Sequence, residues 1–172
     1  MQLMCETELT TQLIHAADDQ RLPLSTLVHN GRPTGIEIEG AILEACVRVL
    51  DCYLVFMTDD IPSEDTLRIY RFDAQLRTRE CVTIGAAYST GAFVMRQLIE
   101  PNLLTFNFIG GGLWRLRVLD KPQLHVPFFS DPKGVSRSLG THTYLKLEHS
   151  LYLQILLLYI QLEQESKHHQ LQ

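Results

Sequence analysis

Residues 104–118 read LTFNFIGGGLWRLRV and predict a β-hairpin. Apolar residues occupy every second position before the three glycines and again after them, which is typical of strands with one buried face. The glycines supply the positive φ angles that a tight reversal of the chain needs. We therefore expect two antiparallel strands in which Trp114 faces a core while Arg115 and Arg117 face outward.

Short apolar runs between turn signals recur through most of the chain. Residues 53–57 are wholly apolar, as in a central strand buried on both faces. Residues 41–49 also favour a strand, although their first half would suit a helix. Further strands are predicted at residues 36–39, 67–72, 81–84, 92–98 and 142–147. Strands do not alternate with helices as in a parallel sheet, so the pattern predicts an antiparallel meander, forming a curved sheet, a sandwich or an open barrel.

An amphipathic helix is expected at the N-terminal end, over residues 6–19. Leu9, Leu13, Ile14 and Ala17 follow helical spacing, and Pro23 lies beyond the end of the segment.

A second helix is expected over residues 150–165, with Ser150 as its N-cap. The segment is apolar around most of its circumference, so two sides of it need cover. One interpretation buries it between the sheet and the N-terminal helix. The other makes it a homodimer or partner contact, with an interface stripe of Leu151, Ile155, Leu158 and Leu162. The polar tail, residues 166–172, is expected to fray. The predicted fold class is thus α+β, in a single domain over residues 1–172.

Composition excludes several classes of protein. The chain has 172 residues, 45% of them hydrophobic, with a formal net charge of −5 and four cysteines. These values argue against disorder, a general nucleic-acid binder and a disulfide scaffold. We see no signal peptide, and the most apolar stretch, residues 151–162, is too short to span a bilayer. The sequence therefore predicts a cytoplasmic protein with reduced thiols and no membrane partner.

Charge is distributed unevenly along the chain. Residues 1–66 carry a net charge of −9, residues 67–117 carry +4, and the remainder is neutral. The acidic residues are densest between positions 59 and 65: Asp59, Asp60, Glu64 and Asp65. Their spacing does not match a calcium loop, and no glycine makes the required sharp turn. We expect a solvated acidic loop without a metal, suited to steering a basic protein partner toward the chain.

All basic residues of the middle strands are arginines, and Arg115 and Arg117 are candidate partner-binding residues. One alternative has them bind phosphate or RNA beside a stacking aromatic residue. The other has the strand arginines pair with acidic residues of neighbouring strands: Glu37, Glu39 and Glu44.

The sequence contains no specific catalytic motif. Nucleophile-elbow and zinc-protease patterns are absent, and the three glycines lack the Lys-Ser/Thr of a phosphate loop. A zinc site from His125, His142 and either Glu148 or His149 is an alternative of low weight. We predict no catalytic residues, no metal and no cofactor, while leaving the enzyme question open.

These observations favour a non-enzymatic binding module. A small acidic cytoplasmic protein of this type would neutralise or inhibit a basic protein partner. Two alternatives remain: a small hydrolase or ligand-binding β-barrel with an unrecognised site, and a homo-oligomeric scaffold assembled through the last helix. A pocket near His125, His142 or Cys81 would favour the hydrolase or ligand-binding alternative.

Overall fold

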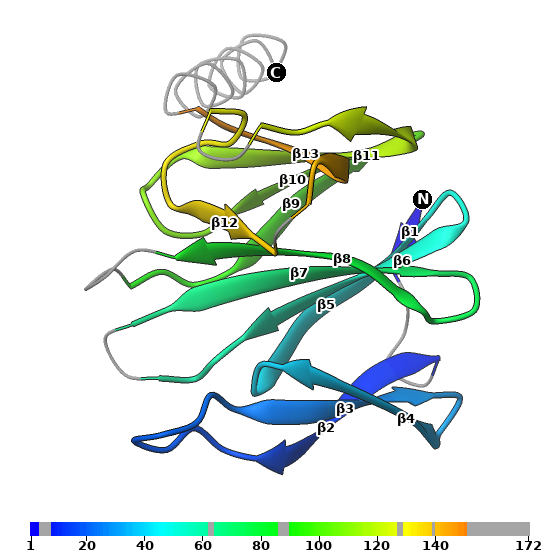
Figure 1. Ribbon diagram of the computed structural model, residues 1–172, viewed down its shortest axis with the longest axis vertical. Helices are drawn as coiled ribbons and strands as arrows, with labels where there is room; N and C mark the ends of the chain where they lie inside the picture. Colours follow the sequence, from blue (N-terminus) through cyan, green and yellow to red (C-terminus); the bar gives the residue numbers. More distant parts are fainter. Residues whose placement is uncertain (4–7, 62–63, 86–89, 127–128, 139, 151–172) are drawn as a thin grey trace, which may run out of the picture.

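The computed structural model describes residues 1–3, 8–61, 64–85, 90–126, 129–138 and 140–150, and this part of the chain is all β (Figure 1). Its strands, in chain order, are β1 (Gln2–Leu3), β2 (Leu9–His15), β3 (Leu24–His29), β4 (Arg32–Glu39), β5 (Ile42–Val49), β6 (Cys52–Thr58), β7 (Thr66–Asp73), β8 (Thr78–Gly85), β9 (Val94–Ile99), β10 (Leu103–Asn107), β11 (Leu113–Leu124), β12 (Val135–Arg137) and β13 (His142–Ser150).

The strands form three antiparallel sheets stacked in layers (Figure 1). A six-stranded central sheet has the order β1-β5-β6-β7-β8-β12. A four-stranded sheet, β13-β11-β10-β9, covers one face of it, and a three-stranded sheet, β2-β3-β4, covers the other. Successive strands are neighbours in most of this arrangement, so the predicted antiparallel pairing is confirmed, but the strands form three stacked sheets and not the predicted curved sheet, sandwich or open barrel.

Two hydrophobic cores fill the spaces between the layers. Phe56 and Ile69 of the central sheet pack in the first core with Phe106 and Trp114 of the four-stranded sheet. The second core joins the other face of the central sheet to the three-stranded sheet: Leu9, Leu27, Ile38, Cys46, Val55, Met57, Tyr70, Phe72 and Leu76. Strand β6 contributes to both cores, so the prediction of a central strand buried on both faces is confirmed.

The hairpin that the sequence predicts at residues 104–118 is present as β10 and β11. Phe106 lies opposite Trp114, and Thr105 lies opposite Arg115. Gly110 and Gly111, at the turn, have φ angles of 86° and 64°. Trp114 is 2% exposed, and its indole N–H donates to the carbonyl oxygen of Ile109 at 3.2 Å.

The predicted N-terminal helix is wrong, because residues 9–15 form strand β2 instead. The β-branched pair Thr10 and Thr11 suits a strand, and β2 pairs along most of its length with β3. Leu13 and Ile14 are 47% and 48% exposed, so the spacing that predicted a helix does not mark a buried face. The α+β fold class is therefore corrected to all β over the described residues.

The predicted C-terminal helix begins at Ser150, which is the last residue of β13. The rest of that segment, residues 151–165, and the tail lie outside the described residues. Within the described part of the chain, we find no helix with the length and apolar character needed to cross a membrane.

Candidate functional site

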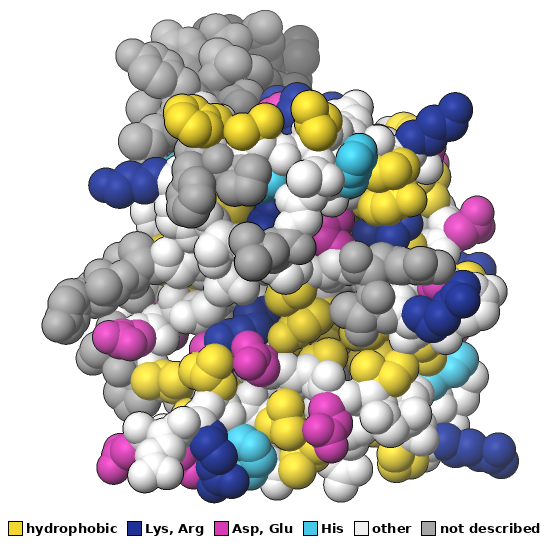
Figure 2. Space-filling view, in the orientation of Figure 1, with side chains coloured by type: hydrophobic (Ala, Val, Ile, Leu, Met, Phe, Trp, Pro, Cys, Tyr) yellow, Lys and Arg dark blue, Asp and Glu magenta, His cyan; other side chains and the backbone are white. Residues whose placement is uncertain are grey.

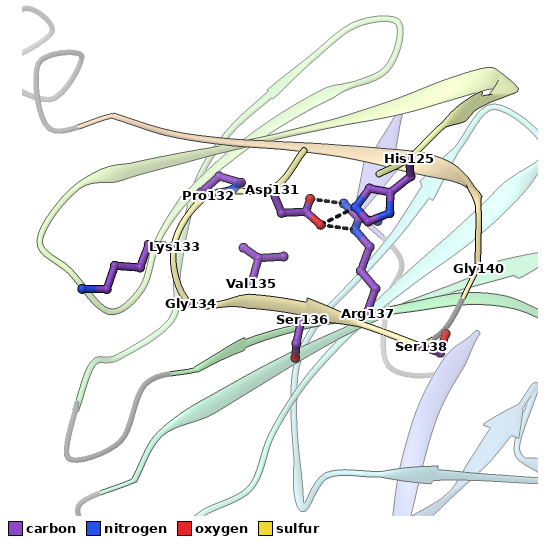
Figure 3. Close-up of a pocket in the computed structure, with 10 residues that line it drawn as sticks. All are labelled: His125, Asp131, Pro132, Lys133, Gly134, Val135, Ser136, Arg137, Ser138 and Gly140. Carbon is purple, nitrogen blue, oxygen red and sulfur yellow. Dashed lines mark hydrogen bonds and ion pairs between the residues drawn. The ribbon is translucent and has the colours of Figure 1, made fainter. Parts of the chain in front are cut away.

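A buried polar cluster joins the central sheet to the four-stranded sheet around the guanidinium group of Arg137 (Figure 3). Arg137 ends β12, Glu80 lies in the neighbouring strand β8, and Thr143 lies in β13 of the facing sheet. Asp131 and His125 come from the segment between β11 and β12. The side chains of Arg137, Asp131 and His125 are 6–9% exposed, so the cluster replaces water with internal hydrogen bonds.

Every N–H group of the Arg137 guanidinium has an acceptor. The Nε and Nη2 atoms donate to the two oxygens of Asp131, each at 2.8 Å. Nη1 donates to Glu80 Oε1 at 2.5 Å and to Thr143 Oγ1 at 2.7 Å, and Nη2 also donates to the carbonyl oxygen of Leu145 at 2.7 Å. Five donors with five acceptors satisfy the guanidinium fully. Arg137 is thus a cross-link between two sheets, and we name Arg137, Asp131, Glu80, Thr143 and His125 the arginine clip.

The carboxylate of Glu80 is also satisfied on both oxygens. Thr143 Oγ1 donates to Oε1, and the backbone N–H of Tyr144 donates to Oε2 at 2.9 Å. The clip thereby fixes the start of β13 against β8.

Asp131 orients His125 at the other end of the clip, with Oδ2 2.6 Å from His125 Nε2. Burial alone would raise the pKa of Asp131, but hydrogen bonds from Arg137 and His125 outweigh it and lower that pKa below its ordinary value. An ionised Asp131 only accepts hydrogen bonds, so the proton of this contact resides on His125 Nε2. In the neutral ring Nδ1 is then a hydrogen-bond acceptor.

Local hydrogen bonds of the segment between β11 and β12 bring His125 close to Asp131. The backbone N–H of His125 donates to the carbonyl oxygen of Thr141 at 2.8 Å. Val126 donates its N–H to Ser130 Oγ at 3.0 Å, and Ser130 donates its N–H back to the carbonyl oxygen of Val126 at 3.1 Å. A second turn follows at Gly134, whose φ of 87° favours glycine.

A cavity of about 460 Å³ adjoins the clip and is lined by His125, Arg137 and eight further residues (Figure 3). Its other lining residues are Asp131, Pro132, Lys133, Gly134, Val135, Ser136, Ser138 and Gly140. In the close-up, Lys133 points away from the clip. This volume is in the usual range for small-ligand sites, about 300–1,000 Å³.

The acidic residues between positions 59 and 65 differ in burial. Asp59 is 3% exposed and forms an ion pair with Arg68 of β7. Arg68 Nε also donates to Glu39 at 3.1 Å, so Arg68 joins the central sheet to the end of β4. Tyr70 extends this contact: its hydroxyl donates to the carbonyl oxygen of Glu39 at 3.1 Å and accepts the Glu39 N–H at 3.0 Å. Asp59 is therefore a structural residue and not part of a solvated loop.

The other acidic residues remain near the surface. Asp60 and Glu64 are exposed. Asp65 accepts the backbone N–H of Gly91 at 2.7 Å, and Asp60, Asp65 and Glu44 line one open cavity of about 430 Å³. We define the acidic end as the five carboxylates that these contacts connect at one end of the central sheet, together with Glu64, the sequence neighbour of Asp65: Glu39, Glu44, Asp59, Asp60, Glu64 and Asp65.

Arg115 and Arg117 belong to a different sheet from the acidic end. Arg115 lies 3.7 Å from Glu148 of the neighbouring strand β13, and Arg117 Nη1 donates to Asn102 at 3.5 Å. The expected pairing of strand arginines with Glu39 holds for Arg68. The predicted interface stripe of Leu151, Ile155, Leu158 and Leu162 lies outside the described residues.

The histidines that the sequence suggested as zinc ligands each make a different contact. His125 bonds to Asp131, His142 Nδ1 lies 3.0 Å from Thr141 Oγ1, and the His149 ring stacks on Trp114 at 4.4 Å. No group of three potential metal ligands occurs among the described residues.

The described cysteines are reduced and lie in the protein interior or at its margin. Cys46, Cys52 and Cys81 are free thiols. Burial, with a smaller contribution from Glu8, raises the pKa of Cys46 to about 12, and burial also raises the pKa values of Cys52 and Cys81. These thiols are poor nucleophiles near neutral pH.

Sequence reasoning missed Asp131, Arg137, Glu80 and Thr143, and considered His125 as a metal ligand or as a residue beside a pocket. Glu80 and Thr143 are 63 residues apart, and no spacing pattern connects them. The one local signal is the opposite charge of Asp131 and Arg137, six residues apart.

Comparison with known proteins gave no match to a protein family, to a curated protein or to a solved structure.

Proposed function

We propose that this protein is a non-enzymatic binding module that recognises a basic surface on another protein and thereby neutralises or inhibits it. The observation that carries the proposal is the composition of the acidic end. Among the described residues, the guanidinium group of Arg68 is the one cation paired with these carboxylates, and it bonds to two of the six, Glu39 and Asp59. The remaining carboxylates keep a net negative potential at the surface.

The division of roles within the acidic end supports a binding surface. The buried Asp59–Arg68 pair holds the end of β6 against β7, which gives the exposed carboxylates a fixed base. Asp60 and Glu64 are free to approach a partner, while Asp65 and Glu44 line an open cavity beside them. Exposed charges of this kind raise the rate of encounter with a partner of opposite charge more than they lower the dissociation rate.

The test compares two variants with the same change in total charge. One variant is Asp60→Lys with Glu64→Lys in the acidic end, and the control is Asp19→Lys with Glu37→Lys, two exposed residues elsewhere. Proteins retained from a native extract at low salt are identified, and the association rate of the purified partner is measured at several salt concentrations.

We expect the wild type and the control to retain a basic partner. In the acidic-end variant the association rate should fall at least about tenfold, with a weaker salt dependence. Equal association rates for both variants, or a retained partner with an acidic contact surface, would contradict the proposal.

The cavity beside the arginine clip favours a second candidate function, the binding of a small molecule. It combines a volume of about 460 Å³ with a buried histidine that Asp131 orients. The test is a small-molecule screen observed by NMR. Hits that shift the resonances of His125 and Lys133, and leave those of Asp60 and Glu64 unchanged, would support this function. An absence of hits at His125 would exclude it for the compounds screened.

A further inference from the structure

Strand β2 is an edge strand without the features that usually prevent edge-to-edge pairing. Among the strands of the described residues, β2 pairs with β3 alone, at one edge of the three-stranded sheet. Its seven residues, LTTQLIH, contain no Asp, Glu, Lys, Arg, Pro or Gly. Leu13 and Ile14 are 47% and 48% exposed, and hydrophobic side chains reach the surface at the bottom of the space-filling view, over this layer (Figure 2). An edge strand without charge or proline readily accepts another strand.

The other sheet edges in the described part of the chain are protected. The opposite edge of the same sheet is β4, which contains Pro33 and two glutamates. The central sheet ends in β1 and β12, which have only two and three residues. The four-stranded sheet ends in β9, with Arg96, and in β13, with Lys146 and Glu148. Short length, proline and charge are the usual means of preventing edge pairing, so β2 is the exception.

The backbone groups at the free edge of β2 can be assigned. The N–H of Asn30 donates to the carbonyl oxygen of Glu8, so the backbone groups of Glu8 face β3. Thr10 and Gln12 lie opposite Val28 and Thr26 in the same register. In an antiparallel ladder N–H and C=O of one residue point to the same side, and alternate residues point to opposite sides. Leu9, Thr11 and Leu13 therefore direct their N–H and C=O groups away from β3, toward the free edge.

We propose that β2 pairs antiparallel with β2 of a second copy of this chain, about a two-fold axis at Thr11. Thr11 then lies opposite its own copy, and Leu9 lies opposite Leu13. The residues that face the free edge are the same three that form hydrogen-bonded pairs in this register, so donors and acceptors match on both sides. The regular part of β2, before the register shift between Leu13 and His15, covers this pairing. Two three-stranded sheets become one continuous six-stranded sheet.

The side chains fit the same register. Leu13, which is 47% exposed in the single chain, lies opposite the buried Leu9 of the second copy, and Thr10 lies opposite Gln12. No like charges meet across the axis, because residues 9–14 carry none. A closed two-fold contact uses the same patch on both copies, which is the commonest symmetry of soluble oligomers. This inference is independent of the proposed recognition of a basic partner.

The first test is the mass of the full chain by analytical ultracentrifugation over a range of concentrations. We expect a reversible dimer in the wild type. Leu13→Lys places a charge opposite Leu9 of the second copy, on each side of the axis, and should weaken the dimer at least about tenfold. Thr11→Pro removes an N–H that faces the free edge while leaving the ladder to β3 intact, so it should also produce a monomer. Far-UV circular dichroism and the emission of Trp114 check that each variant is folded.

The second test uses cysteine pairs and does not depend on either variant. In the proposed register Thr11 and its copy are about 5.5 Å apart at Cα, within the range of disulfides. Gln12 and its copy are about 8 Å apart, which is too far. In a Cys5→Ser background, Thr11→Cys should cross-link under mild oxidation, and Gln12→Cys should not.

Three outcomes would overturn the proposal. The first is a wild-type monomer up to the solubility limit. The second is a dimer that Leu13→Lys leaves unchanged. The third is a dimer that Leu158→Lys dissociates while Thr11→Cys fails to cross-link, because the contact would then lie in the apolar segment after β13.

Discussion

Asp131 and Arg137 lie six residues apart and form a bidentate ion pair in which Nε is 2.8 Å from Oδ2 and Nη2 is 2.8 Å from Oδ1. The remaining donors of Arg137 bond to two strands from different sheets. One side chain therefore connects a surface segment, an edge of the central sheet and the last strand.

Removing the arginine should destabilise the fold strongly. Arg137→Met leaves Asp131 and Glu80 buried without their partner, and breaking a buried pair in this way costs about 3–5 kcal/mol. Urea denaturation monitored by Trp114 emission measures the loss. Arg117→Met serves as the control, because Arg117 is exposed and should change the free energy of unfolding by no more than about 0.5 kcal/mol. Similar losses in both variants would show that the clip does not stabilise the fold.

The lowered pKa of Asp131 should appear as acid sensitivity. A carboxyl group with a folded-state pKa below its unfolded value of 3.8 stabilises the protein fully above that value. This stability is lost as the pH falls through the folded-state pKa. We expect Asp131→Asn to be less stable than the wild type at pH 7 and the difference to narrow as the pH falls below about 4. Urea midpoints across this range test the prediction, and a constant difference would contradict it.

Two neighbouring aspartates should respond differently to the same substitution. Asp59 is 3% exposed and paired with Arg68, whereas Asp60 is exposed. Asp59→Ala leaves the Arg68 guanidinium partly unpaired in the interior and should cost about 3 kcal/mol. Asp60→Ala should cost less, about 1 kcal/mol, because Asp60 is exposed and only its left-handed φ of 54° disfavours alanine. Thermal denaturation of the two variants compares them directly, and equal losses would mean that the buried pair contributes little.

The third glycine of the hairpin should be needed for the packing of His149. A Cβ at position 112 would lie 2.3 Å from His149 Nε2, and the His149 ring stacks on Trp114. Gly112→Ala should therefore displace the ring, change the emission of Trp114 and cost about 1–3 kcal/mol. Gly140→Ala is the control, because its nearest neighbour would be 3.9 Å away. An unchanged Trp114 spectrum in Gly112→Ala would contradict the prediction.

The sequence predicts the fold best where one local pattern decides the structure. The hairpin around the glycines has the expected alternation, and β6 has the expected burial on both faces. Arg68 shows the limit of this reasoning. Its alternation with Leu67 and Ile69 indicates a surface residue, yet it is 6% exposed. A third layer covers the side of the sheet that a two-layer sandwich would leave in water, and no local pattern reports that layer.

The candidate sites could be predicted only in part, for a related reason. The acidic residues are close in sequence, so their proximity is evident, but the burial of Asp59 depends on Arg68, which lies across the sheet in β7. The arginine clip brings together residues from two sheets and a connecting segment. Its members are ordinary residues without a characteristic spacing, and the three-dimensional pairing alone distinguishes them.

The central sheet shares its two faces between two cores, and this arrangement should set the order in which backbone amides exchange with solvent. Amides of β6 and β7 lie between strands on both sides and between layers on both faces, so their exchange requires the whole protein to open. Amides of β2 to β4 can exchange when the three-stranded sheet alone detaches. Such a partial opening would expose Val55, Met57 and Phe72 together. The central sheet would then present an apolar surface to other molecules while it remains folded together with the four-stranded sheet.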